Sequence, residues 1–221
     1  MGFFDYSYSI RDRIFQDFKT TLYMLIVSAI FTGIFGLIIG VIMVVTDRGR
    51  ILENKAIYNF LDKTTNIFRS IPFIILVALI APITRAIVKT RIGPTAAIVP
   101  LVFSAVPFFA RQVEQALASV ENGKIEAALA MGNSPFEIIT SVYLREGVGS
   151  LIRVSSITLI SLLGLTAMAG LVGGGGIGDL AISMGYQRYK DDVVVVSLVL
   201  ILIIVFIIQE VANYLIKKTD H

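Results

Sequence analysis

Long uncharged, mostly apolar runs recur along the chain, and short charged stretches separate them. Spanning the roughly 30 Å core of a bilayer takes about 20 helical residues at about 1.5 Å each. No long linker, low-complexity tract or internal repeat interrupts the pattern, so we expect one all-α domain over residues 1–221. The pattern predicts about five membrane-spanning helices, over residues 20–46, 57–84, 92–110, 154–178 and 193–216.

The second of these helices has the weakest pattern. Its uncharged stretch, Ser70–Thr84, has 15 residues, which is too short to cross a bilayer. The prediction over 57–84 therefore needs Ile57–Phe68 to continue the same helix, and Arg69 to extend its charged end toward the headgroups.

The amino-acid composition agrees with a membrane protein and argues against several other classes of protein. Of the 221 residues, 56% are hydrophobic and 16% are charged, and the mean hydropathy is +0.82. A soluble domain of this length needs more polar surface to cover its core. Cysteine is absent and the only histidine is His221, so we expect no disulfide and no metal site. Lysines and arginines lie scattered between the apolar runs, which favours contact with a lipid bilayer over nucleic-acid binding.

One polar segment, residues 111–153, interrupts the apolar pattern. With five spans it shares a side of the membrane with residues 46–69 and the C-terminus, and together they carry 11 Lys and Arg against 8 on the other side. The positive-inside rule therefore places this segment and the C-terminus in the cytoplasm and the N-terminus outside.

Within this segment the sequence predicts two short helices joined by a tight corner. Residues 125–131 are mostly helix formers and stop at Gly132, which can take the left-handed conformation that ends a helix. Ser134 is then suited to cap a second helix, with Pro135 in its first turn and Glu137 three residues on from the serine.

The second helix carries an apolar stripe of Phe136, Ile139, Val142 and Tyr143 at helical spacing. Two isolated short helices would be marginal in water, so the stripe needs a surface to cover it. That surface is either the chain's own membrane helices or a partner protein, and the spacing does not decide between them.

This segment resembles the cytoplasmic loop of bacterial ABC importer permeases. The shared pattern is Glu-Ala-Ala, three residues and Gly, followed by a distal Val142-x-Leu144. The family usually has proline after that leucine, whereas this chain has Arg145. In the family the two helices dock in a groove on the ATPase subunit. The resemblance implies that the following residues couple the chain to an ATPase: Glu126, Ala127, Ala128, Gly132, Ser134, Phe136 and Glu137.

A wider resemblance, over roughly residues 20–215, is to methionine importer permeases. It implies a type I permease fold in the bacterial cell membrane, a second copy of the chain, two ATP-binding subunits and a substrate-binding lipoprotein that delivers methionine. ATP and magnesium would bind the ATPase, leaving this chain without a cofactor. Another amino acid or a small peptide remains an alternative substrate. The wider match lies in Asn66–Phe73, Ala96–Pro100, Val106–Ala110, Ala167–Asp179 and Gly185–Tyr189.

The residues in the predicted spans also exclude some transport mechanisms. Four of the predicted spans have no charged residue in their interiors, which argues against a proton-coupled transporter or a membrane-embedded enzyme. The glycine run Gly173–Gly178 lacks the lysine and hydroxyl of a phosphate-binding loop, so we predict a sharp turn there. Energy must come from a separate subunit, or else the chain is a passive channel.

Two further features of the spans, a glycine pair and a methionine, each have a structural and a functional interpretation. Gly36 and Gly40 allow a close helix contact, which we expect within one subunit rather than between subunits. Met168, between two alanines, is either a flexible core residue or, from two subunits, a gate on the translocation path.

Overall fold

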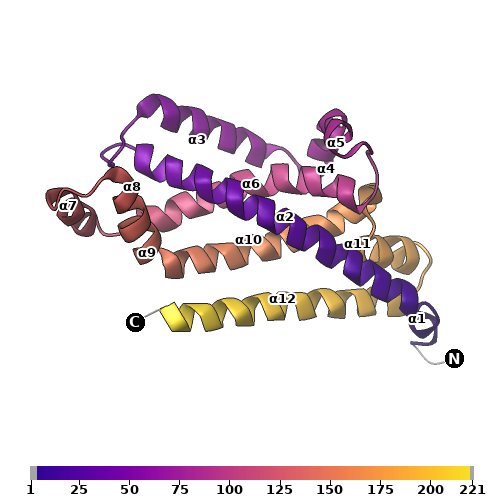
Figure 1. Ribbon diagram of the computed structural model, residues 1–221. Coiled ribbons are helices and arrows are strands. Elements are labelled where there is room, and N and C mark those ends of the chain that lie inside the picture. The colour runs from indigo at the N-terminus through magenta and orange to yellow at the C-terminus, as the bar shows by residue number, and fades with distance from the viewer. Residues whose placement is uncertain (1–3, 220–221) are drawn as a thin grey trace. The chain divides into compact units, whose positions relative to one another are not determined.

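The computed structural model describes residues 4–219, and helices make up most of them (Figure 1). No strand occurs in this range, which confirms the all-α prediction. The helices, in chain order, are α1 Asp5–Ser9, α2 Arg11–Thr46, α3 Lys55–Ser70, α4 Phe73–Leu79, α5 Ala81–Val88, α6 Pro94–Ala118, α7 Asn122–Ala130, α8 Pro135–Ile138, the π-helix η1 Ile139–Tyr143, α9 Leu144–Glu146, α10 Val148–Ala169, η2 Gly170–Gly174, α11 Ile177–Asp179, η3 Leu180–Tyr186 and α12 Asp191–Thr219.

Four helices between residues 4 and 219 are long and apolar enough to cross a membrane: α2, α6, α10 together with η2, and α12. They include most of the predicted spans 20–46, 92–110, 154–178 and 193–216. Many of their apolar side chains are exposed, for example Ile38 on α2 and Ile207 on α12. A helix that is apolar on its exposed side as well as its packed side suits a lipid environment.

Residues 57–84 do not form the one helix that the sequence predicts. The helix α3 ends at Ser70, the backbone is extended at Pro72 (φ −57°, ψ 135°), and the short helices α4 and α5 follow. Proline disfavours helical backbone at the residue before it and has no N–H for a helical hydrogen bond. Whether this broken segment crosses the membrane stays a prediction.

The predicted loop of residues 111–153 is shorter in the structure. The helix α6 continues to Ala118 and α10 begins at Val148, so residues 119–147 alone form the separate two-helix loop. Arg111 lies on α6 because its charge is neutralised there: it contacts Asp62 of α3, and its Nη1 lies 2.7 Å from Glu114 Oε2. Charged residues mark the end of an apolar run, but paired charges need not end the helix.

The described residues pack into two compact units, each built from three stretches of chain. The first unit contains residues 4–30, 71–104 and 159–209, and the second contains 31–70, 105–158 and 210–219. They alternate along the sequence because α2, α6, α10 and α12 each have one end in either unit. They are thus not two sequential domains, and the prediction of one domain stays a prediction.

The core of the second unit is formed where α2 and α6 approach each other. A Cβ added at Gly36 would lie 2.7 Å from Phe109 Cδ1, and one added at Gly40 would lie 2.6 Å from the carbonyl oxygen of Ala110. This confirms that the two glycines serve packing within one chain. Beside this contact lie the buried side chains of Val44, Val45, Val113, Leu117, Val120, Ile125, Ala128, Ile138 and Tyr143.

In the first unit, polar contacts tie the start of α2 to the glycine run. Gly173, Gly175 and Gly176 all have positive φ angles, of 90°, 72° and 85°, which confirms the predicted turn. After the turn, the backbone N–H of Ile177 donates to Thr21 Oγ1 at 2.8 Å. The same unit includes a contact between α1 and α12, where Ser7 donates from its N–H and its hydroxyl to Asp192.

The contact between α2 and α6 leads to a stability prediction. Gly40→Ala forces a methyl group against the Ala110 carbonyl and should cost about 1–3 kcal/mol, lowering the unfolding temperature of the purified protein in detergent. Gly33→Ala is the matched control, because no heavy atom of a neighbour lies within 4 Å of its added Cβ. Equal unfolding temperatures for the two variants would contradict this account of the contact.

Candidate functional site

The first helix of the two-helix loop, α7, ends as the sequence predicts. Gly132 has a φ of +82°, the left-handed conformation that glycine takes without strain. Its N–H donates to the Leu129 carbonyl at 3.0 Å, and the Asn133 N–H donates to the Ala128 carbonyl at 3.2 Å. These two hydrogen bonds close the helix end and turn the chain sharply toward α8.

The second helix, α8, begins with the predicted capping box. The Ser134 N–H donates to Glu137 Oε2 at 2.7 Å, and the Glu137 N–H donates to Ser134 Oγ at 3.4 Å. Pro135 occupies the first turn. The hydrogen bonds from the backbone N–H and hydroxyl of Ser134 lower the pKa of Glu137 below its ordinary value.

Beyond α8 the chain continues as the π-helix η1 and then α9, which the sequence analysis does not predict. Arg145, the residue at which the sequence departs from the resemblance, lies in α9. The Gly147 N–H donates to the Tyr143 carbonyl at 3.0 Å, and the Leu151 N–H donates to the Gly147 carbonyl at 2.8 Å. The helical hydrogen bonds therefore continue from η1 into α10.

One face of the two-helix loop packs on its own unit. Ile125, Ala128, Ile138 and Tyr143 are buried against the ends of α2 and α6. Of the predicted stripe, Ile139 and Val142 also pack here, so the chain's own helices cover the stripe except at Phe136, which is exposed. Burial raises the pKa of the Tyr143 hydroxyl.

Two polar contacts brace the loop at its ends. Arg50, between α2 and α3, donates to Asn122 Oδ1 at 2.8 Å and to the Ala118 carbonyl at 3.1 Å. Lys124 of α7 forms an ion pair with Glu146 of α9. This pairing raises the pKa of Lys124 and lowers the pKa of Glu146. Exposed pairs of this kind contribute little energy, so their main effect is to fix orientation.

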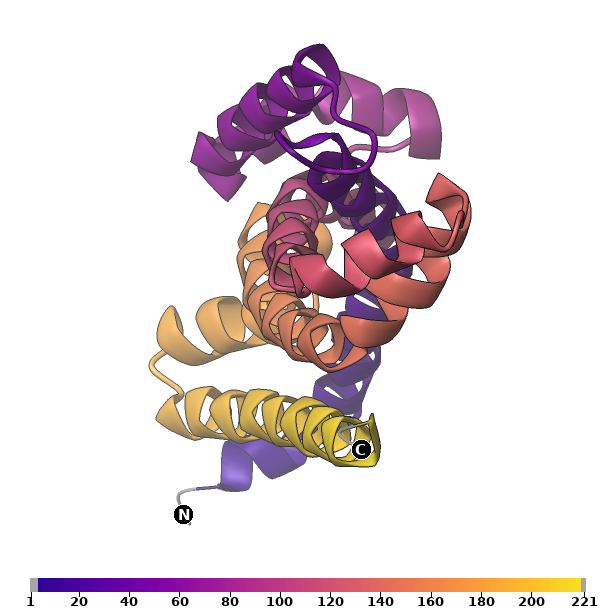
Figure 2. The same ribbon diagram turned by 90° about the vertical axis from the view of Figure 1, so that its left-hand side faces the viewer.

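The opposite face of the loop, whose backbone can be followed in the ribbon of Figure 2, is exposed and partly apolar. Phe136 is 74% exposed, Met131 is 73% exposed and Leu129 is 48% exposed. Large apolar side chains grouped on a surface outside the candidate spans are typical of an interaction site.

The predicted coupling residues divide into three groups in this structure. Glu126, Ala127 and Phe136 are exposed, whereas Ala128 is buried. Gly132, with Ser134 and Glu137, shapes the corner. The sequence analysis missed Arg50, because its partners lie some 70 positions away and no local pattern indicates them.

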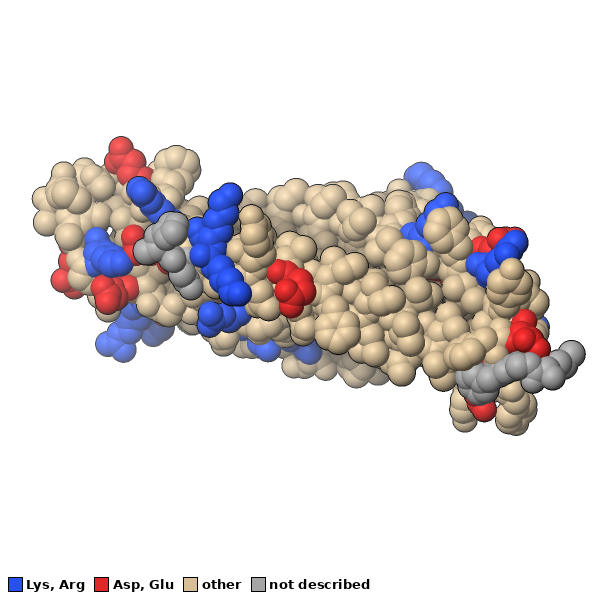
Figure 3. Space-filling view, turned by 90° about the horizontal axis from the view of Figure 1, so that it is seen from below, with Lys and Arg blue, Asp and Glu red and all other residues tan. Residues whose placement is uncertain are grey.

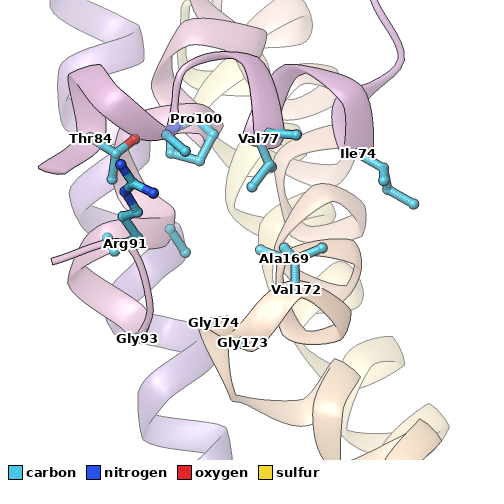
Figure 4. A pocket seen from close by; sticks show the side chains of 14 residues that line it. Ile74, Val77, Thr84, Arg91, Gly93, Pro100, Ala169, Val172, Gly173 and Gly174 are labelled. Atoms are coloured by element: carbon cyan, nitrogen blue, oxygen red, sulfur yellow. The ribbon is translucent and has the colours of Figure 1, made fainter.

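The first unit contains a cavity of about 310 Å³ (Figure 4). Most of its wall is apolar and comes from α4, α5, α6, the end of α10 and η2. Figure 4 shows Thr84 and Arg91 on one side of it and Ala169 and Val172 on the other. A single cation among apolar walls suits a small molecule with an apolar part and an acidic group. Met168 is 37% exposed and does not line this cavity, although its neighbour Ala169 does.

Between residues 4 and 219, no group of three His, Cys, Asp or Glu side chains is placed to hold a metal ion. His221 lies outside the described residues.

Residues 36–219 match a known protein family, the binding-protein-dependent transport system inner membrane component. The chain belongs to this family. The match includes the two-helix loop and the whole lining of the cavity. Family membership confirms the predicted location in the bacterial inner membrane and the resemblance to importer permeases.

Individual family members are similar over most of the chain. The probable D-methionine transport system permease protein MetI of Vibrio cholerae is 42% identical over 201 residues, covering 91% of this chain and 89% of that protein. The methionine import system permease protein MetP of Bacillus subtilis is 44% identical over 179 residues, 81% of each chain. A chain from a structure of inward-facing conformations of the MetNI methionine ABC transporter has a TM-score of 0.94, with 41% identity over 96% of this chain and 99% of that one. This confirms the type I permease fold.

The capping box predicts that the local stability of the two-helix loop depends on pH. The pKa of Glu137 is lowered in the folded loop. The stabilisation of the loop by the Glu137 carboxylate is therefore complete above the ordinary glutamate pKa, about 4.3, and is lost as the pH falls through the lowered pKa. Hydrogen-exchange protection of residues 134–140, corrected for intrinsic rates, should fall in that acidic range.

Glu137→Gln is the control for this titration. Its amide oxygen can still accept from the Ser134 N–H but does not titrate, so its protection should stay level where that of the unmodified chain falls. Identical acid profiles for the two proteins would refute the role of this carboxylate.

Proposed function

We propose that the chain is the membrane-spanning permease subunit of an ATP-driven importer of methionine. An extracytoplasmic binding protein, a lipoprotein, delivers the substrate, and a separate ATPase supplies the energy. Relatives named as methionine permeases, at 42% and 44% identity, support the substrate. The observation that carries the mechanism is the two-helix loop, with one face packed on α2 and α6 and the other exposing Leu129, Met131 and Phe136.

The exposed face of the loop is the contact with the ATPase. Burying a side chain as large as that of Phe136 contributes about 1.5–3 kcal/mol to docking. Glu126 and Ala127 lie on the same exposed side of the loop, and Gly132 sets the angle between its helices. These residues transmit force and catalyse nothing.

The packed face passes that force into the membrane helices. Ile125 and Ala128 of α7 and Tyr143 of η1 share one core with Val45 of α2 and Leu117 of α6. Because close-packed side chains cannot be compressed, movement of α7 must move the ends of α2 and α6. Arg50 strengthens this link by holding Asn122 and the end of α6 together.

The working assembly contains two copies of this chain and two ATPase subunits. ATP and magnesium bind the ATPase, since the glycine run of this chain lacks the lysine and hydroxyl of a phosphate loop. The cavity of the first unit, apolar with one guanidinium, is suited to an amino acid with an apolar side chain. Another amino acid or a small peptide is the alternative substrate.

Uptake in proteoliposomes tests both the substrate and the coupling loop. The chain, reconstituted with its ATPase and binding protein, should accumulate labelled methionine only with ATP, and among a panel of amino acids and small peptides methionine should compete best. Glu126→Lys and Gly132→Trp should insert normally and lower uptake at least about tenfold, because losing about 1.4 kcal/mol of docking weakens association by that factor.

The matched control is Glu210→Lys, the same charge reversal at an exposed carboxylate of α12 outside the loop, which should leave uptake within about twofold. Normal uptake by both loop variants would refute the coupling role. Equilibration of labelled methionine across the vesicle membrane without ATP would instead indicate a passive channel.

Met168 is proposed as a gate where two copies of the chain face the translocation path. Met168→Gly should raise the leak of methionine across the vesicle membrane or increase ATP hydrolysed per molecule transported, because the side chain that narrows the path is removed. Met168→Leu keeps the side-chain volume and should restore both values. If Met168→Gly changes neither leak nor basal ATP hydrolysis, the gate is excluded.

A further inference from the structure

The second unit contains its own cavity, of about 550 Å³, at the base of the two-helix loop. It lies between α9 with the first turns of α10 on one side and the last turns of α12 on the other. Its polar lining includes Arg145, Arg153 and Ser150, and Val148 and Ile216 contribute apolar surface. Arg145 is the residue that departs from the usual proline of related permeases, and the proposed coupling mechanism gives it no role.

Helical spacing brings the two arginines to the same wall. Arg145, Gly149 and Arg153 are four residues apart in turn, and the helical hydrogen bonds continue through Gly147, so the three lie on one stripe. Gly149, which also lines the cavity, has no side chain to fill the space between the two guanidinium groups.

The charges of this cavity are unbalanced. Among the described residues that line it, the carboxylate is Glu146, which is already paired with Lys124 and whose pKa Arg145 also helps to lower. Neither Arg145 nor Arg153 forms an ion pair with a carboxylate anywhere in residues 4–219, and both are exposed. Two guanidinium groups beside a serine hydroxyl match the geometry and charge of a phosphate group.

The position of the cavity points to a phosphate held at a membrane surface. One candidate span begins at Val148 and another ends at Thr219, and both residues line the cavity. The last turn of α12 adds Lys217 and Lys218, and Figure 3 shows Lys and Arg side chains gathered around this end of α12. Helix ends of this kind lie at the depth of the lipid headgroups.

We propose that this cavity binds the phosphate of an anionic phospholipid headgroup, with Arg145 and Arg153 as its main ligands. The apolar residues Val148 and Ile216 would face the start of the acyl chains. Because α9 directly follows η1, the bound lipid holds the base of the two-helix loop at the membrane surface. Lipid binding at this cavity is independent of which solute is transported.

Native mass spectrometry of the full-length chain, with any subunits that co-purify, tests this. The delipidated protein is titrated with phosphatidylglycerol, phosphatidylcholine or inorganic phosphate. Phosphatidylglycerol should bind preferentially, and Arg145→Gln with Arg153→Gln should weaken it about tenfold or more. Gly149→Leu should weaken it as well, by filling the cavity without changing any charge. Thermal unfolding in detergent checks that these variants are folded.

Arg48→Gln with Lys55→Gln is the charge-matched control, because both residues are exposed in the second unit and neither lines the cavity. It should bind phosphatidylglycerol within about twofold of the unmodified chain. If this control loses as much phosphatidylglycerol binding as the Arg145 and Arg153 variant, the lipid is attracted by the general positive charge of the surface and the proposed site is wrong. Inorganic phosphate that binds as tightly as phosphatidylglycerol would show that free phosphate, and not a lipid, is the ligand.

Discussion

The close contact between α2 and α6 at Gly36 and Gly40 is the interaction on which the second unit depends. With no side chain at these two positions, the helices come close enough for Phe109 and Val113 to pack against the backbone of α2. The core that forms beside them is also the surface on which α7 and η1 rest. Close packing of two membrane helices therefore determines the position of a loop outside the membrane.

Charged groups within this unit are kept where they can be paired. Glu114 is buried, accepts from the Tyr58 hydroxyl at 3.0 Å and is paired with Arg111, which also contacts Asp62. An unpaired charge in such a position would be costly, whereas this network joins α3 to α6. Arg145 and Arg153 at the base of the loop differ from Arg111, because neither forms an ion pair within residues 4–219.

We propose that the two-helix loop links this packing to transport. Its buried side gives it a rigid attachment to α2 and α6, and its exposed apolar side gives it a surface for another protein. A loop with only one of these faces could either bind a partner or move the membrane helices, but could not do both. In the proposed mechanism, this division of faces lets an external ATPase move the membrane helices.

The sequence by itself determined the features that arise from neighbouring residues. The apolar runs, the helix end at Gly132, the capping box of Ser134 and Glu137 and the turn in the glycine run all follow from local backbone and hydrogen-bond preferences. Even the break at Pro72 has a local cause, although the pattern of apolar residues alone concealed it.

Only the tertiary structure decided which side of each element is buried. Tyr143 and Phe136 belong to one predicted stripe, yet Tyr143 is fully buried and Phe136 is exposed, because the π-helix η1 and the core on α2 and α6 place them differently. The cavities, and the contacts of Arg50, likewise bring together residues far apart in the chain. Local preferences carry no information on such distances, so these features require the packed chain.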